Sequence, residues 1–407
     1  MAINMLAANS DYERIVIASA IASRILLLFL IVFWRSLVSP YDTSASLNPA
    51  CLIDSSSSPL AGQPVLFPRI GSAIESSIVW DGVHFVRIAE CGYEYEKSYA
   101  FLPLLPLCIS FLSHTVLLPL VPVIGHRAVL GLSGYLINNI AFVLAARYLF
   151  RLSHIILKDV EAAMRASILF CFNPASIFYS SLEHCSGRLP DEMRPWCKAR
   201  VPLLYNFVQN YYWGVGFLRY FRFEQLPNFL LASPILSLAF FSIVHYGKSR
   251  PKLLLSVGFQ ATAEDRNSAA MLYFPERVPR SSMPRHTVAS SSGLQGNQNL
   301  RRKKQIIGQN PAKLSVEDKT FSGSGYSSAF VIPFILHMGF MAATAIFVMH
   351  VQVATRFLSA SPPLYWFASY VMVNPGRFKR WGYIIWAYSV AYILLGSLLF
   401  SNFYPFT

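Results

Sequence analysis

Five stretches of this chain are apolar over nearly the 20 or so residues that an α-helix needs to cross a bilayer. They cover residues 15–34, 128–150, 229–246, 330–349 and 381–400. Only 13% of the 407 residues are charged, whereas soluble domains carry about 25%. The pattern therefore predicts an all-α polytopic membrane protein and excludes a soluble globular fold.

The first apolar segment is too long for the h-region of a signal peptide and is not followed by a small-residue cleavage site, so we expect it to remain as a membrane anchor. Arg24 lies inside it. A charge at mid-bilayer is costly unless it faces protein or water. Two interpretations stay open: Arg24 faces the helix bundle or snorkels to the membrane surface, or it contacts a phosphate-bearing lipid.

The charged residues are distributed unevenly between the apolar segments. The hydrophilic stretch 40–97 is acidic and the stretch 247–328 is basic, which fits loops on opposite sides of a membrane. We expect a membrane region over 1–246 with lumenal loops at 40–97 and 183–225, a disordered cytoplasmic loop at 247–328, and a second membrane region over 329–407. The basic run at 301–304 lacks interleaved aromatic residues, so it does not indicate nucleic-acid binding.

This topology conflicts with the number of apolar segments. Three apolar blocks, 101–124, 128–150 and 166–182, separate the two loops expected in the lumen, and an odd number of crossings cannot begin and end on one side. Either the proline-rich block 101–124 is re-entrant or broken, or the chain lacks a piece that comparable proteins have.

The six cysteines show neither zinc-ligand spacing nor a Cys-x-x-Cys motif. Cys185 and Cys197 share one hydrophilic loop and could pair if that loop is lumenal; the alternative is that the cysteines are inert thiols. A glycine-rich phosphate loop and a DxD motif are both missing from the sequence, so it supports neither a nucleotide-sugar donor nor a metal.

The densest group of acids and aromatics, WDGVHFVRIAECGYEYE, occupies residues 80–96. Ser76 or Ser77 could cap a helix over 78–91, and Gly92 would end it. Asp81, His84 and Ile88 would then share one face of that helix. The segment is either an interfacial helix with Trp80 at the lipid headgroups or the site of the chemistry.

The motif is similar to the first-loop signature of the PIG-V family of GPI mannosyltransferases. The similarity continues over residues 172–178, 201–221, 225–234, 350–357 and 362–366. In the first loop, the residues that carry it are Trp80, Asp81, His84, Phe85, Ile88, Ala89, Glu90, Gly92, Tyr93, Tyr95, Glu96, Ala100, Phe101, Pro103 and Pro106.

The resemblance implies a GT-C-type transmembrane helical bundle in the endoplasmic reticulum membrane, multi-pass, with lumenal loops that carry short helices and a lumenal active site. It implies an inverting α-1,6-mannosyltransferase that moves the second mannose from dolichyl-phosphate mannose to the glycosylphosphatidylinositol (GPI) precursor lipid. No cofactor is expected, and a small accessory membrane subunit is a candidate partner. By this resemblance Asp81 is the catalytic base.

Nine further residues are candidate substrate contacts on the same resemblance. His84 would orient Asp81 or contact the donor phosphate, Arg356 would clamp a phosphate or simply end a span, and Glu90 and Glu96 would bind sugar hydroxyls or be solvated acids. Asn173, before Pro174, would break its helix and expose backbone to the cavity. The full set is Trp80, His84, Glu90, Tyr93, Glu96, Asn173, His350, Gln352 and Arg356.

One departure from the family pattern follows Ser181, where several further membrane helices are expected before the segment at 195–206. An internal block is therefore expected to be missing, which would account for the odd number of crossings. The alternatives are another dolichol-linked mannosyltransferase, a catalytically inactive shortened family member, and a polytopic lipid-binding or transport protein.

Overall fold

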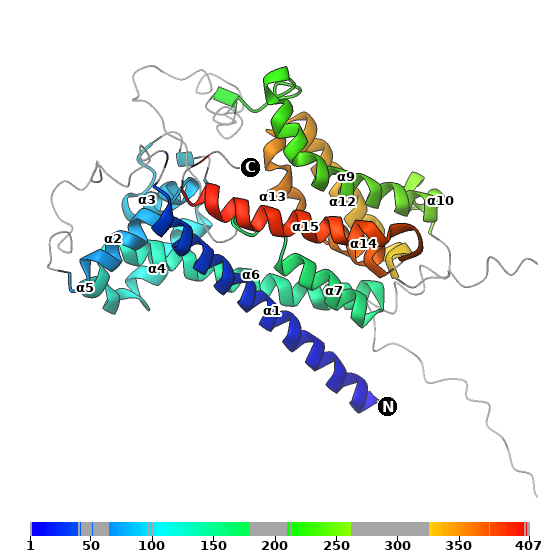
Figure 1. Ribbon diagram of the computed structural model, residues 1–407, viewed down its shortest axis with the longest axis horizontal. Helices are drawn as coiled ribbons and strands as arrows, with labels where there is room; N and C mark the ends of the chain where they lie inside the picture. Colours follow the sequence, from blue (N-terminus) through cyan, green and yellow to red (C-terminus); the bar gives the residue numbers. More distant parts are fainter. Residues whose placement is uncertain are drawn as a thin grey trace, which may run out of the picture. The chain divides into compact units, whose positions relative to one another are not determined.

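The computed structural model describes residues 2–39, 41, 51, 65–95, 98–99, 101–178, 210–211, 214–261, 325–373, 375–402 and 404. Within these residues all regular structure is helical (Figure 1). Five segments are long and apolar enough to cross a membrane: Ser10–Leu37, His126–Leu157, Phe223–Ser249, Ala329–Phe347 and Arg380–Phe400. The five predicted spans and the all-α polytopic fold are thereby confirmed.

The five spans fall in helices α1 (Ala2–Leu37), α6 (His126–Leu157), α9 (Leu226–Ser249), α12 (Ile332–Phe347) and α15 (Pro375–Phe400). The shorter helices are α2 (Pro68–Ser77), α3 (Asp81–Cys91), α4 (Leu104–His114), α5 (Val121–Ile124), α7 (Val160–Cys171), α10 (Pro251–Leu255), α13 (Ala354–Leu358) and α14 (Pro362–Val373). Single 3₁₀ turns are η2 (Leu118–Leu120), η4 (Phe223–Gln225), η5 (Gly325–Ser327), η6 (Ala329–Val331) and η7 (Val351–Val353).

Helices α2 to α5 gather at the N-terminal end of α6 (Figure 1). Their shared core contains Ile78, Val83, Val86 and Ile109, packed against Leu130 of α6. Burying these side chains supplies about 25 cal/mol per Å² of apolar surface removed from water. This cluster fixes the first loop at one end of the bundle.

The proline-rich block 101–124 returns to the loop that it leaves. The axis bends by 68° between Leu104–His114 and Leu118–Ile124. At the far end of the block, the N–H groups of Leu66 and Phe67 donate to the carbonyls of Pro122 and Val123, at 3.1 and 2.8 Å. The predicted break in this block is present, and the contacts of its far end with the first loop favour the re-entrant alternative.

Residues 160–178 run alongside α1 in the same direction. The Cys171 thiol lies 3.9 Å from the Val16 carbonyl, and further on Ile177 packs against Leu27, Leu30 and Ile31. Helix α6 is antiparallel to α1, because Glu13 near the start of α1 pairs with Arg151 near the end of α6. The chain therefore leaves the first loop along α6 and returns along 160–178 toward the end of α1 that adjoins this loop.

Arg24 faces the interior of the bundle, as the first of its two interpretations predicts. Its side chain is 3% exposed. Two of its nitrogens donate to the carbonyl and the hydroxyl of Ser176, both at 3.0 Å, and its guanidinium lies 3.7 Å from the centre of the Phe142 ring. Arg24 thus joins α1 to the segment that follows α7.

The two ends of the basic segment predicted at 247–328 are ordered and packed. Helix α9 continues to Ser249, and α10 follows it directly. Tyr326 is buried, and its hydroxyl hydrogen-bonds with that of Ser242 at 2.6 Å. The rest of this segment, residues 262–324, lies outside the described residues, as do its predicted disorder and basic run.

We expect Arg24→Ala to lower the thermal unfolding midpoint of the detergent-purified protein. The substitution removes the hydrogen bonds that Arg24 donates to the buried carbonyl and hydroxyl of Ser176. This loss should lower the free energy of unfolding by about 1–3 kcal/mol. The matched control is Arg14→Ala, because the Arg14 side chain is 81% exposed. Equal midpoints for the two variants would refute the structural role of Arg24.

Candidate active site

The helix that carries Asp81 starts later than the sequence suggests. Ser76 and Ser77 do not cap it: they belong to the last turn of α2, where their hydroxyls donate to the carbonyls of Ala73 and Ile74. Helix α3 begins at Asp81 and ends at Cys91, and Gly92 caps its end as predicted, with its N–H donating to the Ile88 carbonyl. Asp81 and His84 therefore do lie one turn apart on one helix.

Trp80 makes a strained turn between α2 and α3. Its backbone angles are φ 54° and ψ −132°, and the N–H of Gly82 donates to the carbonyl of Val79 at 3.1 Å. This is a type II′ turn, whose second residue is normally glycine, and such a conformation costs a bulky residue about 1–3 kcal/mol. Phe400 stabilises Trp80 in this conformation. The Trp80 indole N–H donates to the Phe400 carbonyl at 3.0 Å, and the two rings stack with their centres 5.8 Å apart.

These contacts make Trp80 a positioning residue for its neighbour, Asp81. The turn places the Asp81 carboxylate in the first turn of α3, where the helix dipole favours negative charge. The predicted contact of Trp80 with a substrate stays a prediction.

Asp81 and Arg356 interact electrostatically, although they come from the first loop and from α13. Burial raises the pKa of Asp81 to about 7, and the positive charge of Arg356 opposes that rise. Burial likewise lowers the pKa of Arg356 to about 10, opposed by Asp81. The residue Asp81 is partly exposed. A pKa of about 7 places its carboxyl group between its two protonation states near neutral pH.

Aromatic rings enclose this pair. The Arg356 guanidinium lies 4.1 Å from the centre of the Phe178 ring, and Phe178 meets the Phe400 ring edge-on at 4.9 Å. Phe400 in turn stacks on Trp80. Three distant parts of the chain thus build one wall, and the low polarity of that wall strengthens the interaction between the two charges.

The other first-loop candidates brace α3. The buried His84 ring packs on Phe101 at 4.7 Å, and the Tyr93 hydroxyl donates to the Phe101 carbonyl at 2.7 Å. Glu90 forms a 3.0 Å ion pair with Arg127 of α6 and is 15% exposed, so its interpretation as a solvated acid is wrong. Glu96 lies outside the described residues.

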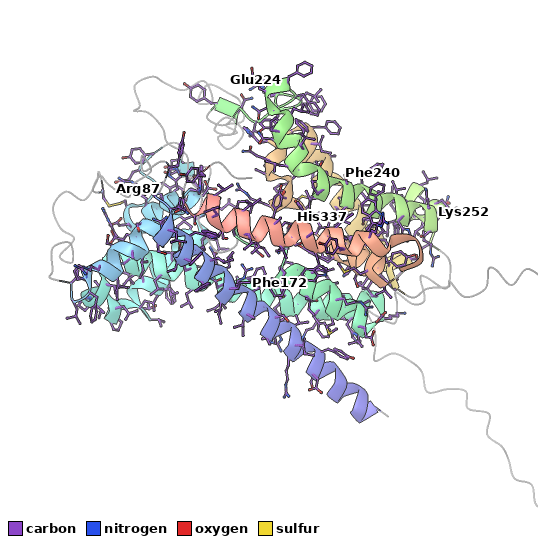
Figure 2. The ribbon with its side chains drawn as sticks, viewed as in Figure 1. Arg87, Phe172, Glu224, Phe240, Lys252 and His337 are labelled. Atoms are coloured by element: carbon purple, nitrogen blue, oxygen red, sulfur yellow. A yellow bond between two sulfur atoms is a disulfide. The ribbon has the colours of Figure 1, made fainter. Side chains whose placement is uncertain are left out.

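Sequence reasoning missed an ion pair next to these residues. Arg87 and Glu94 meet at 2.8 Å, with side chains 11% and 1% exposed. Their placement on the last turns of α3 and just beyond Gly92 could have suggested the pairing. Figure 2 labels Arg87 on α3.

The residues proposed in the C-terminal half divide between two places. Arg356 lies with Asp81, whereas His350 and Gln352 lie with Tyr220: the ring centres of His350 and Tyr220 are 4.6 Å apart, and the Tyr220 hydroxyl donates to Gln352 at 3.2 Å. The side chain of Asn173 is fully buried and donates to the Phe170 carbonyl at 2.7 Å. The predicted break before Pro174 is confirmed, since α7 ends at Cys171, but the Asn173 side chain is closed off from a ligand.

Cys51 and Cys91 form a disulfide, with their Cα atoms 5.4 Å apart. The expectation that the cysteines are inert thiols is wrong for these two, whereas Cys108 and Cys171 are free thiols. The bridge closes a loop that contains α2, the strained turn and Asp81. Both cysteines lie in or at the edge of the acidic first loop, which could have suggested the bridge. Cys185 and Cys197 lie outside the described residues.

Among the described residues, Glu94 and the two bridged sulfurs are the sole cluster with metal-ligand geometry. A disulfide offers no thiolate, and Glu94 is already paired with Arg87. We therefore assign no metal to this cluster.

An apolar groove of about 490 Å³ lies between α7, α9, α14 and α15. Tyr388, which lies beside Thr355, lines it at one end. Lys248 lines it at the other. From Pro234 to Lys248 of α9 the groove extends about 20 Å at 1.5 Å per residue. It therefore runs along much of the thickness of a bilayer.

Comparison with known proteins matches the chain in two blocks to one family. A family model described as Mannosyltransferase (PIG-V) matches residues 13–186 and 182–407. GPI alpha-1,6-mannosyltransferase 2 of Mus musculus is 23% identical over 81% of this chain and 87% of its own length, and GPI mannosyltransferase 2 of Drosophila melanogaster is 24% identical over 81% and 86%. No solved structure matches.

The two matched blocks meet at 182–186, where the sequence was expected to depart from the family pattern. GPI alpha-1,6-mannosyltransferase 2 of Homo sapiens is 23% identical over 96% of this chain and 98% of its own length, in an alignment of 545 positions. Because that alignment is longer than the 407-residue chain, the human protein carries residues without a counterpart here.

The disulfide predicts a labelling pattern. Without reductant, a thiol reagent should modify Cys108, which is partly exposed, and should leave Cys51 and Cys91 unmodified. After reduction and denaturation all three should react, as read by peptide mass spectrometry. Labelling of Cys51 or Cys91 in the unreduced, membrane-extracted protein would contradict the bridge.

Proposed function

Since the chain belongs to the mannosyltransferase (PIG-V) family, we propose that it transfers mannose from dolichyl-phosphate mannose to the GPI precursor through an α-1,6 linkage. Membership makes it a glycosyltransferase embedded in a membrane by several helices. The observation that carries the proposal is the electrostatic interaction of the Asp81 carboxylate with Arg356 at a partly exposed residue.

The proposed reaction is a single in-line displacement with inversion. The acceptor hydroxyl oxygen attacks the anomeric carbon of the donor mannose, the bond from that carbon to the phosphate oxygen breaks, and dolichyl phosphate leaves. The hydroxyl proton passes to Asp81. A general base with a pKa near the working pH is efficient and contributes about 10²–10⁴-fold, and burial gives Asp81 such a pKa.

Arg356 suits the leaving group. As the phosphate departs it gains negative charge, and a guanidinium forms strong, often bidentate hydrogen bonds to phosphate oxygens. The same positive charge limits the rise in the pKa of Asp81 that burial causes. One cation would thus serve both the base and the leaving group.

The apolar groove supports a lipid-linked donor. Two of the helices that line it, α9 and α15, are long and apolar enough to span the membrane. At one end it is lined by Tyr388, which lies beside Thr355, the neighbour of Arg356 in the chain. A polyprenyl chain in the groove would leave its phosphate at that end. A nucleotide sugar has no hydrocarbon chain that could bind in this groove.

The disulfide supports a lumenal site. Disulfides persist in oxidising compartments such as the lumen of the endoplasmic reticulum, and the bridge between Cys51 and Cys91 lies in the loop that contains Asp81. An accessory subunit stays a prediction from the family.

Two alternatives concern the acceptor and the shortened middle of the chain. Another dolichol-linked mannosyltransferase would keep the same donor chemistry and differ in its acceptor. An inactive form would follow if the residues that relatives carry beyond Ser181 are needed for transfer. Complementation separates these cases.

Cells deficient in the second mannosylation step of GPI synthesis should recover surface GPI-anchored proteins on expression of the wild-type chain, measured by flow cytometry. We expect Asp81→Asn to fail, with transfer in isolated membranes reduced about 10²-fold or more. The control is Asp11→Asn, because the Asp11 side chain is 70% exposed on α1.

Equal rescue by the wild type and Asp81→Asn would contradict the assigned base. Failure of all three chains at matched expression would show that this form is inactive in that step.

A further inference from the structure

A second cavity, of about 380 Å³, lies apart from Asp81. It is lined by Gly214, Arg219, Tyr220, Arg222, Gln225 and His350. It lies at the N-terminal end of α9, where Figure 2 labels Glu224, the neighbour of Gln225. Among these lining residues there are two guanidinium groups and an imidazole, and none is acidic, so the cavity favours an anion.

The walls of the cavity are hydrogen-bonded to the end of α12 and to η7, which precede α13 in the chain. The N–H groups of Gly216 and Leu218 donate to the carbonyls of Val348 and Phe347, at 3.1 and 2.7 Å. Tyr220 donates to Gln352 at 3.2 Å and accepts from Asn228 at 2.8 Å. The segment 214–222 and η7 therefore form one preorganised unit, which lowers the cost of ordering it around a ligand.

A strained backbone supports a functional reading of this segment. Leu218 has a φ of 56°, in the left-handed region that costs a non-glycine residue about 1–3 kcal/mol. The next residue, Arg219, donates to the Asn210 side chain at 2.6 Å. A guanidinium has five N–H donors, so this contact orients the group while most of its donors remain able to bind a ligand.

The position of the cavity indicates which anion it takes. From His350 to Arg356 the chain advances about 10 Å, at about 2.0 Å per residue in the 3₁₀ turn and 1.5 Å in α13. In the donor, the phosphate is bonded directly to the anomeric carbon, so it must bind beside the base. In the acceptor, the phosphodiester is separated from the attacking hydroxyl by the mannose, glucosamine and inositol rings, so it must bind at a distance.

We propose that this cavity, with Arg219, Arg222 and His350, binds the phosphodiester of the acceptor glycolipid, while Arg356 serves the donor phosphate. The inference rests on the proposed function. Planar guanidinium groups match the oxygens of a phosphodiester, and the amide of Gln225 and the hydroxyl of Tyr220 suit the hydroxyls of the adjoining inositol.

A binding experiment tests the ligand class without requiring catalysis. Glycerophosphoinositol, which carries the phosphodiester without lipid chains, is titrated by thermophoresis into the full chain in phosphatidylcholine nanodiscs. We expect Arg219→Gln/Arg222→Gln to bind about 10-fold more weakly than the wild type or worse. The control is Arg69→Gln, an exposed arginine on α2, which should bind like the wild type.

Inorganic phosphate is titrated in parallel. If it binds the wild type as tightly as glycerophosphoinositol does, the cavity is a general phosphate site and the acceptor assignment is overturned. Unchanged affinity for glycerophosphoinositol in the double variant also overturns it. Arg219→Lys/Arg222→Lys keeps the charge, and partial recovery of binding at a wild-type unfolding midpoint excludes a folding defect.

Kinetics then separate the two substrates. In the double Gln variant we expect the KM for the acceptor to rise about 10-fold or more, with kcat and the KM for dolichyl-phosphate mannose within twofold of the wild type. A rise in the donor KM would overturn the assignment. If the wild type transfers no mannose but still binds glycerophosphoinositol through these arginines, the proposed function fails and the anion site stands.

Discussion

The interaction between the Asp81 carboxylate and the Arg356 guanidinium is the one on which the rest of the site depends. Each charge is partly removed from water, and each opposes the pKa shift that burial imposes on the other. Buried charge pairs contribute little to stability because desolvation offsets their attraction. Perturbed groups of this kind are concentrated at functional sites, which fits the roles in transfer that we propose for Asp81 and Arg356.

The surrounding structure holds the pair together from several parts of the chain. The disulfide and the Glu90–Arg127 ion pair fix α3 against its loop and against α6. Phe400, at the end of α15, anchors the strained turn before Asp81. Phe178, at the end of the segment joined to α1 by Arg24, covers Arg356. The C-terminal span is therefore part of the site, which no local motif at residues 80–96 reveals.

The parts that the sequence predicts well depend on local patterns. Five spans follow from continuous apolar runs, the end of α3 from Gly92, and the break before Pro174 from proline chemistry. The sequence predicts too early a start for α3, because nothing in it indicates that Trp80 adopts a backbone conformation typical of glycine. The bridge from Cys51 to Cys91 and the separation of His350 from Arg356 depend on tertiary contacts, which spacing alone does not encode.

The dependence of mannosyl transfer on pH tests the central claim most directly. Since Asp81 accepts a proton only when ionised, and burial raises its pKa to about 7, kcat/KM of the wild type should fall as the pH drops through about 7. Arg356→Gln removes the charge that lowers this pKa, so the midpoint of its residual activity should move to higher pH. The same midpoint in both proteins, or a wild-type midpoint near the ordinary carboxyl pKa of about 4, would contradict the account.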